Sequence, residues 1–262
     1  MRTVTRLSIA PVKSMALQHP DEVRLERYGV PENRRFYLTE PDGRLVSGAK
    51  FGSLMRIRAD YDASLDWLSL GFPDASVVEG ETQVLGQPVS TSLWGRPISG
   101  RAVIGPWADA ISSFLGRPVL LVKPDRLGDA NDETPVSLMS TASAEELARQ
   151  AGRSTSVDGR RFRMLVELAG CEPHEEDTWA GRRLRIGQAV VRVGGPIPRC
   201  VVTTLHPDVG IKDFDTLKTI AAYRGVTPDR DINFGMYADV VEPGMIAVGD
   251  EVALTDAEQV TS

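Results

Sequence analysis

Short strand-like segments separated by turn residues run along most of this chain. Three stretches predict β-hairpins, over residues 34–48, 182–195 and 244–254. Their turns are expected at Pro41-Asp42-Gly43, Gly187-Gln188 and Gly249-Asp250. Glycine, proline and aspartate favour turns, and many short strands at close spacing favour a barrel or sandwich over a doubly wound sheet. The pattern therefore predicts a β-rich fold.

Three helical segments interrupt the strands, over residues 105–118, 140–152 and 213–225. In the first, Trp107, Ile111 and Phe114 fall on one face, because their spacing of four and three residues follows the helical period. In the second, Ser143 followed by Glu146 matches a capping box, with Ser143 as the N-cap. Strands and helices together predict an α+β, β-rich protein.

Charge and cysteine content narrow the class of protein. The formal net charge of the 262 residues is -6, which argues against a nucleic-acid binder or a protein that binds anionic membranes. Two cysteines, Cys171 and Cys200, can build neither a disulfide framework nor a CxxC zinc site. The N-terminus lacks the apolar core of a signal peptide, and no apolar run reaches membrane-spanning length. We therefore expect a soluble, cytoplasmic protein without nucleic-acid or membrane partners.

Several familiar catalytic motifs are absent from the sequence. It contains no Walker A loop, no GxGxxG after a strand and no GxSxG elbow. The three histidines, His19, His174 and His206, are far apart and match no metal-ligand spacing. These observations argue against a P-loop nucleotide site, a serine hydrolase and a zinc hydrolase.

Cys200 lies in the segment GGPIPRCVVTTLHPDVG, residues 194–210. Three interpretations are open: a buried small apolar residue, a thiolate nucleophile, or a thiolate ligand to a soft or borderline metal. Arg199 would favour the thiolate, and Pro196 and Pro198 would restrict the backbone around it. Since one thiolate cannot hold a metal alone, a cofactor would have to bring the other ligands. For Cys171 we expect structural burial.

Seven segments of the second half follow one another in a recognisable order. They are RRFRMLVELAG, EEDTW, LRIG, RCVVTTLHPDVG, TLKTIAAYRG, FGMYA and PGMIAVGDEV. In order and spacing they resemble a MOSC domain (molybdenum cofactor sulfurase C-terminal domain). The segments RLSIAPVKS and YGVPENRRFYLTEPDGRLVSG resemble the β-barrel domain that precedes MOSC in the mitochondrial amidoxime-reducing component subfamily. The resemblance implies an N-terminal β-barrel domain over residues 1–125, interleaved with a MOSC β-barrel over residues 126–262. The polar stretch 123–135 is the candidate boundary or functional loop.

The resemblance also implies a molybdenum cofactor (Mo-molybdopterin) between the two domains. In the family, the cysteine of the RC motif coordinates molybdenum, so Cys200 is the expected metal ligand and catalytic residue. The pterin part carries a phosphate, which basic and hydroxyl residues bind. The expected cofactor-binding residues are Lys13, Ser14, Arg35, Thr134, Arg163 and Arg199.

Three positions depart from the family pattern. Leu165 stands where the amidoxime-reducing proteins typically have asparagine, and Pro198 where a serine is common. Loss of a buried hydrogen bond costs about 1–3 kcal/mol, or about ten- to hundredfold in affinity. His206 stands where an aspartate is common.

The activity implied is the reduction of N-oxygenated substrates of the amidoxime or hydroxylamine type. Electrons would come from a separate ferredoxin, cytochrome or flavin reductase. Two alternatives remain open. One is a carrier of the cofactor, or of a sulfane sulfur on Cys200, without reductase activity. The other is a MOSC scaffold that has exchanged the cofactor for a different small anionic ligand.

Overall fold

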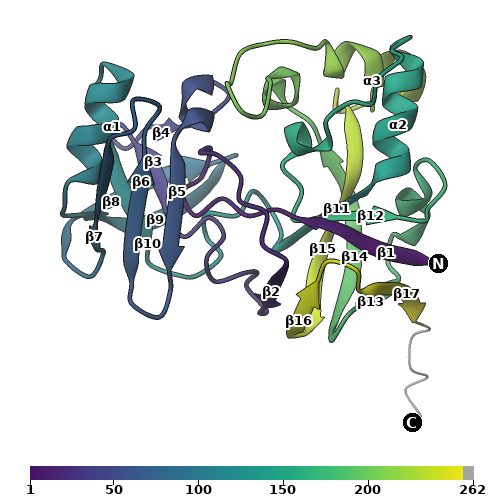
Figure 1. Ribbon diagram of the computed structural model, residues 1–262, viewed down its shortest axis with the longest axis horizontal. Coiled ribbons are helices and arrows are strands. Elements are labelled where there is room, and N and C mark those ends of the chain that lie inside the picture. Colours follow the sequence, from purple (N-terminus) through teal and green to yellow (C-terminus); the bar gives the residue numbers. More distant parts are fainter. Residues whose placement is uncertain (256–262) are drawn as a thin grey trace.

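The computed structural model describes residues 1–255 and has two lobes side by side (Figure 1). The first lobe consists mainly of residues 36–124 and the second mainly of residues 136–255. Both are built around β-strands, so the predicted α+β, β-rich class is confirmed. Within the described residues, no helix combines the length and apolar character needed to cross a membrane.

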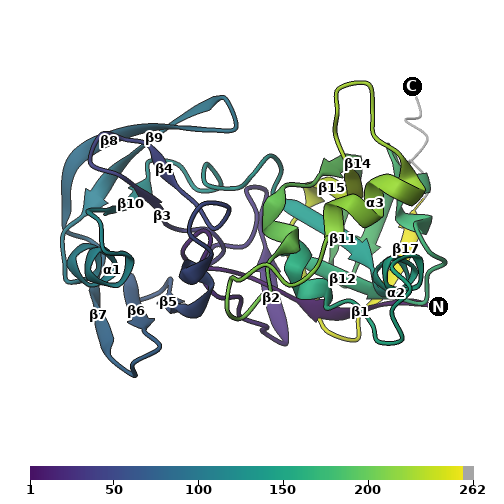
Figure 2. The same cartoon turned by 90° about the horizontal axis from the view of Figure 1, so that it is seen from above.

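A closed seven-stranded barrel forms the second lobe. In order around it, the strands are β1 (Arg2–Leu7), β12 (Val166–Ala169), β11 (Val136–Ser140), β15 (Asn233–Glu242), β14 (Ala189–Pro198), β13 (Arg183–Ile186) and β17 (Glu251–Thr255). β11 and β12 are parallel, which requires a crossover, and α2 (Thr141–Gln150) supplies it. α3 (Thr216–Arg224) lies beside α2 on the outside of the barrel (Figure 2). The barrel encloses an apolar core that includes Leu138, Leu184 and Met236.

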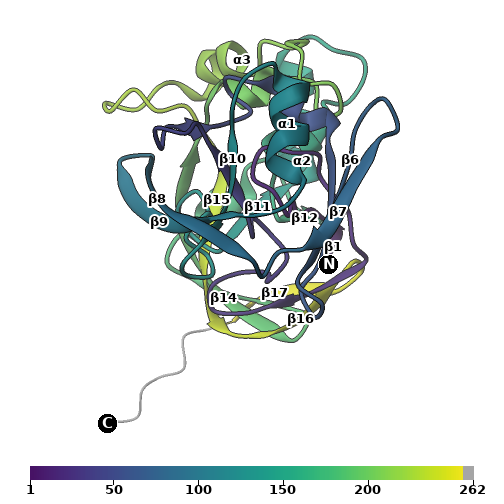
Figure 3. The same cartoon turned by 90° about the vertical axis from the view of Figure 1, so that its left-hand side faces the viewer.

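The first lobe contains two sheets around one core. The five-stranded sheet has the order β4 (Leu45–Val46), β3 (Tyr37–Thr39), β10 (Leu120–Pro124), β9 (Arg96–Val103) and β8 (Leu85–Leu93). The three-stranded sheet has the order β5 (Arg58–Asp62), β6 (Trp67–Gly71) and β7 (Val77–Glu81). Side chains from both sheets and from α1 (Trp107–Leu115) bury Phe36, Leu68 and Trp107. Figure 3 shows α1 between the β8–β9 hairpin and β6–β7.

The chain begins in the second lobe, crosses to the first, and returns. β1 lies between β12 and β17 of the barrel, and β2 (Glu22–Leu25) pairs with β16 (Gly244–Ala247). Residues 125–135 form the loop from β10 of the first lobe to β11 of the second. The lobes are therefore interleaved at the chain's beginning, while a domain boundary near residue 125 stays a prediction.

Two of the three predicted hairpins are confirmed. β3 pairs with β4 across the turn at residues 41–43, and β13 pairs with β14 across Gly187-Gln188. The third prediction is wrong, because β16 pairs with β2 whereas β17 pairs with β1 and β13. The turn at Gly249 is present, but its backbone N–H donates to the carbonyl of Val4 instead of closing a hairpin. β1 thus takes the edge that a hairpin partner would have occupied.

The three predicted helices are present, with one capping error. α1 buries Trp107 and Ile111 and ends at Gly116, whose φ of 65° is the left-handed conformation usual after a helix. The N-cap of α2 is Ser140 instead of Ser143, and the Oγ of Ser140 accepts the backbone N–H of Ser143 at 3.1 Å. The Oγ of Ser143 donates to the buried carboxylate of Glu176 at 2.7 Å. The N-cap of α2 therefore lies three residues before the predicted one.

Candidate functional site

A cavity of about 680 Å³ lies between the lobes, with Cys200 in its wall. The N-terminal segment, the β8–β9 turn and the β10–β11 loop contribute Lys13, Ser14, Arg34, Trp94 and Asp132. The second lobe contributes Arg161, Arg163, Pro198, Arg199 and Tyr237. Four predicted cofactor-binding residues therefore share this cavity with Cys200, namely Lys13, Ser14, Arg163 and Arg199.

Cys200 lies where β14 ends and a short 3₁₀ helix, η4 (Val201–Thr204), begins. It is exposed at the cavity, so its interpretation as a buried apolar residue is wrong. Among residues 1–255, no histidine forms a hydrogen bond with its thiol; the Nδ1 of His206 accepts the backbone N–H of Asp208 instead. The position leaves the thiol accessible to a ligand in the cavity and gives it no histidine as a general base.

Arg199 fixes the backbone beside the thiol. Its Nε donates to the carbonyl of Phe234 at 2.7 Å, and its Nη1 donates to the carbonyl of Phe162 at 3.2 Å. The guanidinium also lies 5.4 Å from the ring centre of Phe162. Burial lowers the pKa of Arg199 to about 10. Its donors are largely occupied by carbonyls, so its main role is to hold Cys200 against β15.

Lys13 and Arg34 meet on one carboxylate. The Nζ of Lys13 donates to Asp132 at 2.7 Å and to the carbonyl of Ala130 at 2.9 Å, and Arg34 pairs with the second oxygen of Asp132. Burial lowers the pKa of Lys13 to about 8, although Asp132 opposes that shift. Burial alone would raise the pKa of Asp132, but the two cations hold it well below its usual value. Asp132 therefore occupies the place at which these cations would otherwise bind an outside anion.

Arg163 contributes a buried donor that has no partner. Its φ of 53° is left-handed, and its Nη2 donates to the carbonyl of Met15 at 2.7 Å. Its Nη1 is buried without a hydrogen-bond acceptor among the described residues. Burial lowers the pKa of this guanidinium to about 10. Because buried polar groups nearly always have partners, the unpaired nitrogen leaves Arg163, a residue of the cavity lining, with one donor that an anion could use.

Two predicted cofactor-binding residues do not line this cavity. The guanidinium of Arg35 lies 5.9 Å from the ring centre of Phe36 in the first lobe, and the lining position belongs to Arg34. Arg34 lies in a turn and has a φ of 50°, so which of the two adjacent arginines faces the cavity depends on the conformation of that turn. Thr134 lies in a small adjoining cavity of about 30 Å³ that also touches Arg34 and Arg163, and its Oγ1 donates to the carbonyl of Val136.

The positions that depart from the family pattern differ in their surroundings. Leu165 is buried in the barrel core and borders only the small cavity, whereas Pro198 lines the large one. Cys171 is half-buried against the barrel core, and burial raises the pKa of its thiol to about 11. Cys171 is thus far less prone to ionise than an ordinary thiol.

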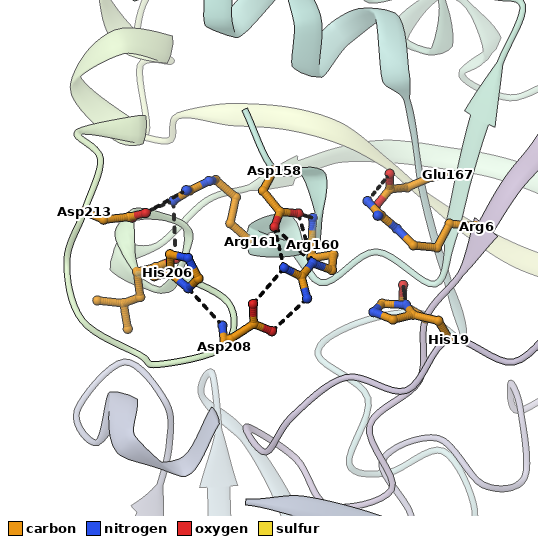
Figure 4. A network of polar contacts seen from close by, with 11 residues as sticks. Arg6, His19, Asp158, Arg160, Arg161, Glu167, His206, Asp208 and Asp213 are labelled. Carbon is orange, nitrogen blue, oxygen red and sulfur yellow. Dashed lines mark hydrogen bonds and ion pairs between the residues drawn. The ribbon is translucent and has the colours of Figure 1, made fainter. Parts of the chain in front are cut away.

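An ion-pair network that the sequence reasoning missed holds the loop after Cys200 (Figure 4). Arg160 binds both Asp158 and Asp208 through its guanidinium, with contacts of 2.7 Å to each. Arg161 donates to the carbonyl of Thr203 at 3.0 Å and pairs with Asp213 at 3.2 Å. The two adjacent arginines in RRFR, residues 160–163, are the sequence feature from which this network could have been predicted. These contacts fasten residues 203–213 to the barrel.

The donor set fits a ligand that combines a soft metal with a phosphate. Within residues 1–255, no three His, Cys, Asp or Glu side chains are grouped so that they could hold a metal ion. A metal at Cys200 would therefore need its remaining ligands from a cofactor. Thiolates suit soft and borderline metals, and guanidinium and ammonium groups suit phosphates. Cys200, the unpaired Arg163 and the paired Lys13 and Arg34 supply both kinds of group.

Curated proteins are similar to most of this chain. The chain is 28% identical, over an alignment 282 positions long, to the mitochondrial amidoxime reducing component 2 of Bos taurus, covering 95% of this chain and 82% of the relative. It is 27% identical to the mitochondrial amidoxime-reducing component 1 of Homo sapiens, covering 96% and 82%. It is also 37% identical over 91 residues to a molybdenum cofactor sulfurase of Oryza sativa, covering 33% of this chain and 11% of the relative.

Two family models divide the chain between them. Residues 1–118 match the MOSC N-terminal beta barrel domain. Residues 125–253 match the MOSC domain. Together with the closed barrel that carries Cys200 at the end of β14, these matches establish the family. The chain belongs to the MOSC proteins that carry the N-terminal beta barrel domain.

Proposed function

We propose that this chain binds a molybdenum cofactor in the inter-lobe cavity and reduces N-oxygenated compounds of the amidoxime or hydroxylamine type. The observation that carries the proposal is a single cavity lined by the exposed Cys200 and by Arg163, whose buried Nη1 has no acceptor among the described residues. The names of the relatives, amidoxime reducing components and a molybdenum cofactor sulfurase, support it.

Each residue would have a defined task. When bound, the cofactor would supply a metal centre that exchanges two electrons with the substrate. Cys200 would hold the metal through its thiolate, while Arg199 keeps that thiolate in place through the carbonyls of Phe162 and Phe234. Arg163 would make the first contact with the phosphate, because its Nη1 has no acceptor to exchange. Lys13 and Arg34 would share their charge between the phosphate and Asp132.

The overall reaction needs electrons from outside the chain. Reduction of an amidoxime to an amidine breaks the N–O bond, consumes two electrons and two protons, and releases water. Two cysteines are too few for an iron–sulfur cluster held by four thiolates. We therefore propose a separate ferredoxin, cytochrome or flavin reductase as donor, and the reducing cytoplasm as the compartment.

Pro198 favours a second candidate, a carrier of the cofactor or of sulfane sulfur. It lines the inter-lobe cavity with a ring that has no hydroxyl, where the resemblance places a serine as a cofactor contact. A weaker hold on the pterin suits a protein that passes its cargo on. Sulfane sulfur released from Cys200 by cyanide, without substrate turnover, would favour this candidate.

The first test is cofactor content. Protein from a cofactor-competent host is analysed for molybdenum by elemental mass spectrometry and for pterin by fluorescence after oxidation. We expect near-stoichiometric metal in the wild type and in Cys171→Ala, and its loss in Cys200→Ala with little change in unfolding. Cys171→Ala is the matched control, because it removes the other thiol without touching the cavity. Absence of metal and pterin from wild type, in a host that loads a positive control, refutes the proposal.

The second test is turnover. Benzamidoxime and an artificial electron donor are supplied, and benzamidine is quantified by chromatography. Metal without turnover favours the carrier. Turnover that disappears in Cys200→Ala and persists in Cys171→Ala supports the reductase.

A further inference from the structure

The β8–β9 hairpin ends in a turn whose sequence contradicts its backbone. Trp94 and Gly95 connect Leu93 to Arg96, and they have φ values of 56° and 85°. A two-residue hairpin with positive φ at both positions strongly prefers Asn-Gly or Asp-Gly, because a bulky L-residue is strained there. A tryptophan in such a conformation is an observed outlier from which a functional role can be inferred.

The strained tryptophan lies at the candidate site. Trp94 lines the same cavity as Cys200, and 63% of its surface is exposed. The other aromatic residues of the lining are Phe162, which is buried between the barrel and the helices α2 and α3, and Tyr237, which is half-buried in β15 and pairs with Ser137 of β11. Among the described lining residues, Trp94 therefore offers the most open aromatic surface.

Hydrogen bonds orient this indole. Its Nε1–H donates to the carboxylate of Asp132 at 3.0 Å, the same carboxylate that pairs with Lys13. Next to it, Arg96 donates to the carbonyls of Asp129 and Asn131 at 2.8 and 2.9 Å. The polar edge of the indole is thus satisfied and the turn is fastened to the β10–β11 loop. No aromatic or cation–π pair among residues 1–255 includes the ring of Trp94.

We propose that Trp94 is a stacking surface for a planar aromatic ring bound in the inter-lobe cavity. This inference rests on the proposed function and specifies its substrate class: N-oxygenated compounds whose N–O group is attached to an aromatic or heteroaromatic ring. Offset stacking is the preferred arrangement of such rings, and a rigid indole loses little entropy when it stacks. The pterin of the cofactor is the other possible source of a planar ring.

The informative variant is Trp94→Asn. Asparagine suits a positive φ and favours the Asn-Gly turn, so the hairpin is kept while the ring is removed. Trp94→Phe restores a smaller ring. Trp67→Thr is the matched control, because Trp67 is a partly exposed tryptophan on β6 that does not line the cavity.

Binding is measured without turnover, on protein from a cofactor-competent host and from a host that cannot make the cofactor. Benzamidoxime, acetamidoxime and pterin-6-carboxylate are titrated while the indole N–H resonances are followed by ¹⁵N–¹H NMR. The Trp94 signal is the one that Trp94→Asn removes. We expect benzamidoxime to shift it and acetamidoxime to leave it unchanged, and Trp94→Asn to raise the Kd of the aromatic compound about three- to tenfold. Trp94→Phe should recover part of this loss, and Trp67→Thr should bind as wild type does.

The outcomes distinguish the ring sources and the two proposals. A shift with pterin-6-carboxylate, only in protein that lacks the cofactor, assigns the surface to the pterin. No shift with either ring, or equal affinity in wild type and Trp94→Asn, overturns the inference. That result leaves the proposed function intact if molybdenum and turnover are present. Conversely, if protein from the cofactor-competent host binds the ring but contains no molybdenum, although that host loads a positive control, the stacking surface is supported and the reductase is refuted.

Discussion

The two lobes touch where two glycines face each other. Gly52 begins a short 3₁₀ helix of the first lobe, η1 (Gly52–Arg56), and Gly210 lies in the loop that follows Cys200. A Cβ atom added to Gly210 would lie 1.8 Å from the carbonyl oxygen of Gly52, and one added to Gly52 would lie 2.0 Å from that of Gly210. Since both obstacles are backbone atoms, a methyl group at either position must push the loop and η1 apart. We predict that either alanine variant destabilises the protein and disturbs the cavity.

Three variants separate the steric cost from the cost of the backbone conformation. Gly116 has a φ of 65° and a ψ of 28° and no atom within 4 Å of an added Cβ, so Gly116→Ala should cost only the left-handed penalty, about 1–2 kcal/mol. Gly52 lies outside the positive-φ region, so Gly52→Ala should cost only overpacking, about 1–3 kcal/mol. Gly210 has a φ of 69° as well as the contact, so Gly210→Ala should cost about 2–5 kcal/mol.

Urea unfolding measures these costs, and the rate at which a thiol reagent modifies Cys200 reports on the loop. Cys171→Ala is the background for the rate measurement, so that one thiol is followed. The double variant Gly52→Ala/Gly210→Ala should cost less than the sum of the single variants, because the first methyl group already separates the backbones. Equal free energies of unfolding for Gly210→Ala and Gly116→Ala would refute the reasoning, since the inter-lobe contact would then contribute nothing.

Two further predictions concern charged groups near the site. Burial lowers the pKa of Lys13 to about 8, compared with 10.5 for an ordinary lysine. Between these two pH values the unfolded chain binds more protons at this group than the folded protein does, so the free energy of unfolding rises with pH. Urea unfolding at pH 7.5 and 9.5 should therefore show a smaller rise for Lys13→Met than for wild type, and equal rises would contradict the assignment. Arg161→Lys should cost about 1–3 kcal/mol and speed modification of Cys200 severalfold, because the carbonyl of Thr203 loses its donor. The control is Arg149→Lys, at an exposed pair with Glu146, which should cost less than about 0.5 kcal/mol and leave the rate of Cys200 modification unchanged. If Arg161→Lys also leaves that rate at the wild-type value, the loop does not depend on Arg161.

The sequence predicted local structure best where one short segment decides it. The turns at Gly43 and Gly187, and the end of α1 at Gly116, follow from residues that suit turns and helix ends. The third hairpin failed because its outcome depends on β1, which lies at the other end of the chain and takes the available edge of β17. Short-range patterns carry no information about such a competitor.

The same limit applies to the candidate site: residues within one motif could be predicted, and contacts between distant segments could not. Cys200 and Lys13 are the single cysteine and the single lysine of their motifs, and both line the cavity. The arginine motif contains two adjacent arginines, and the one that lines the cavity is Arg34, not the predicted Arg35. Asp132 lies in the polar stretch marked as a functional loop, but its pairing with Lys13 joins distant parts of the sequence. The sequence did not indicate a turn at Trp94, because two-residue turns with positive φ prefer asparagine, aspartate or glycine at this position.

The N-terminal segment explains why fold and site depend on each other. β1 completes the barrel of the second lobe, and shortly afterwards an isolated bridge between Val12 and Phe36 fastens the same segment to the first lobe, next to Lys13. A ligand that contacts both Lys13 and Cys200 therefore requires both lobes to be folded and in place. Its binding free energy adds to the stability of the whole molecule, about 2.7 kcal/mol at a hundredfold excess over Kd. The same coupling makes the Gly52–Gly210 contact a determinant of affinity, although neither glycine need touch the ligand.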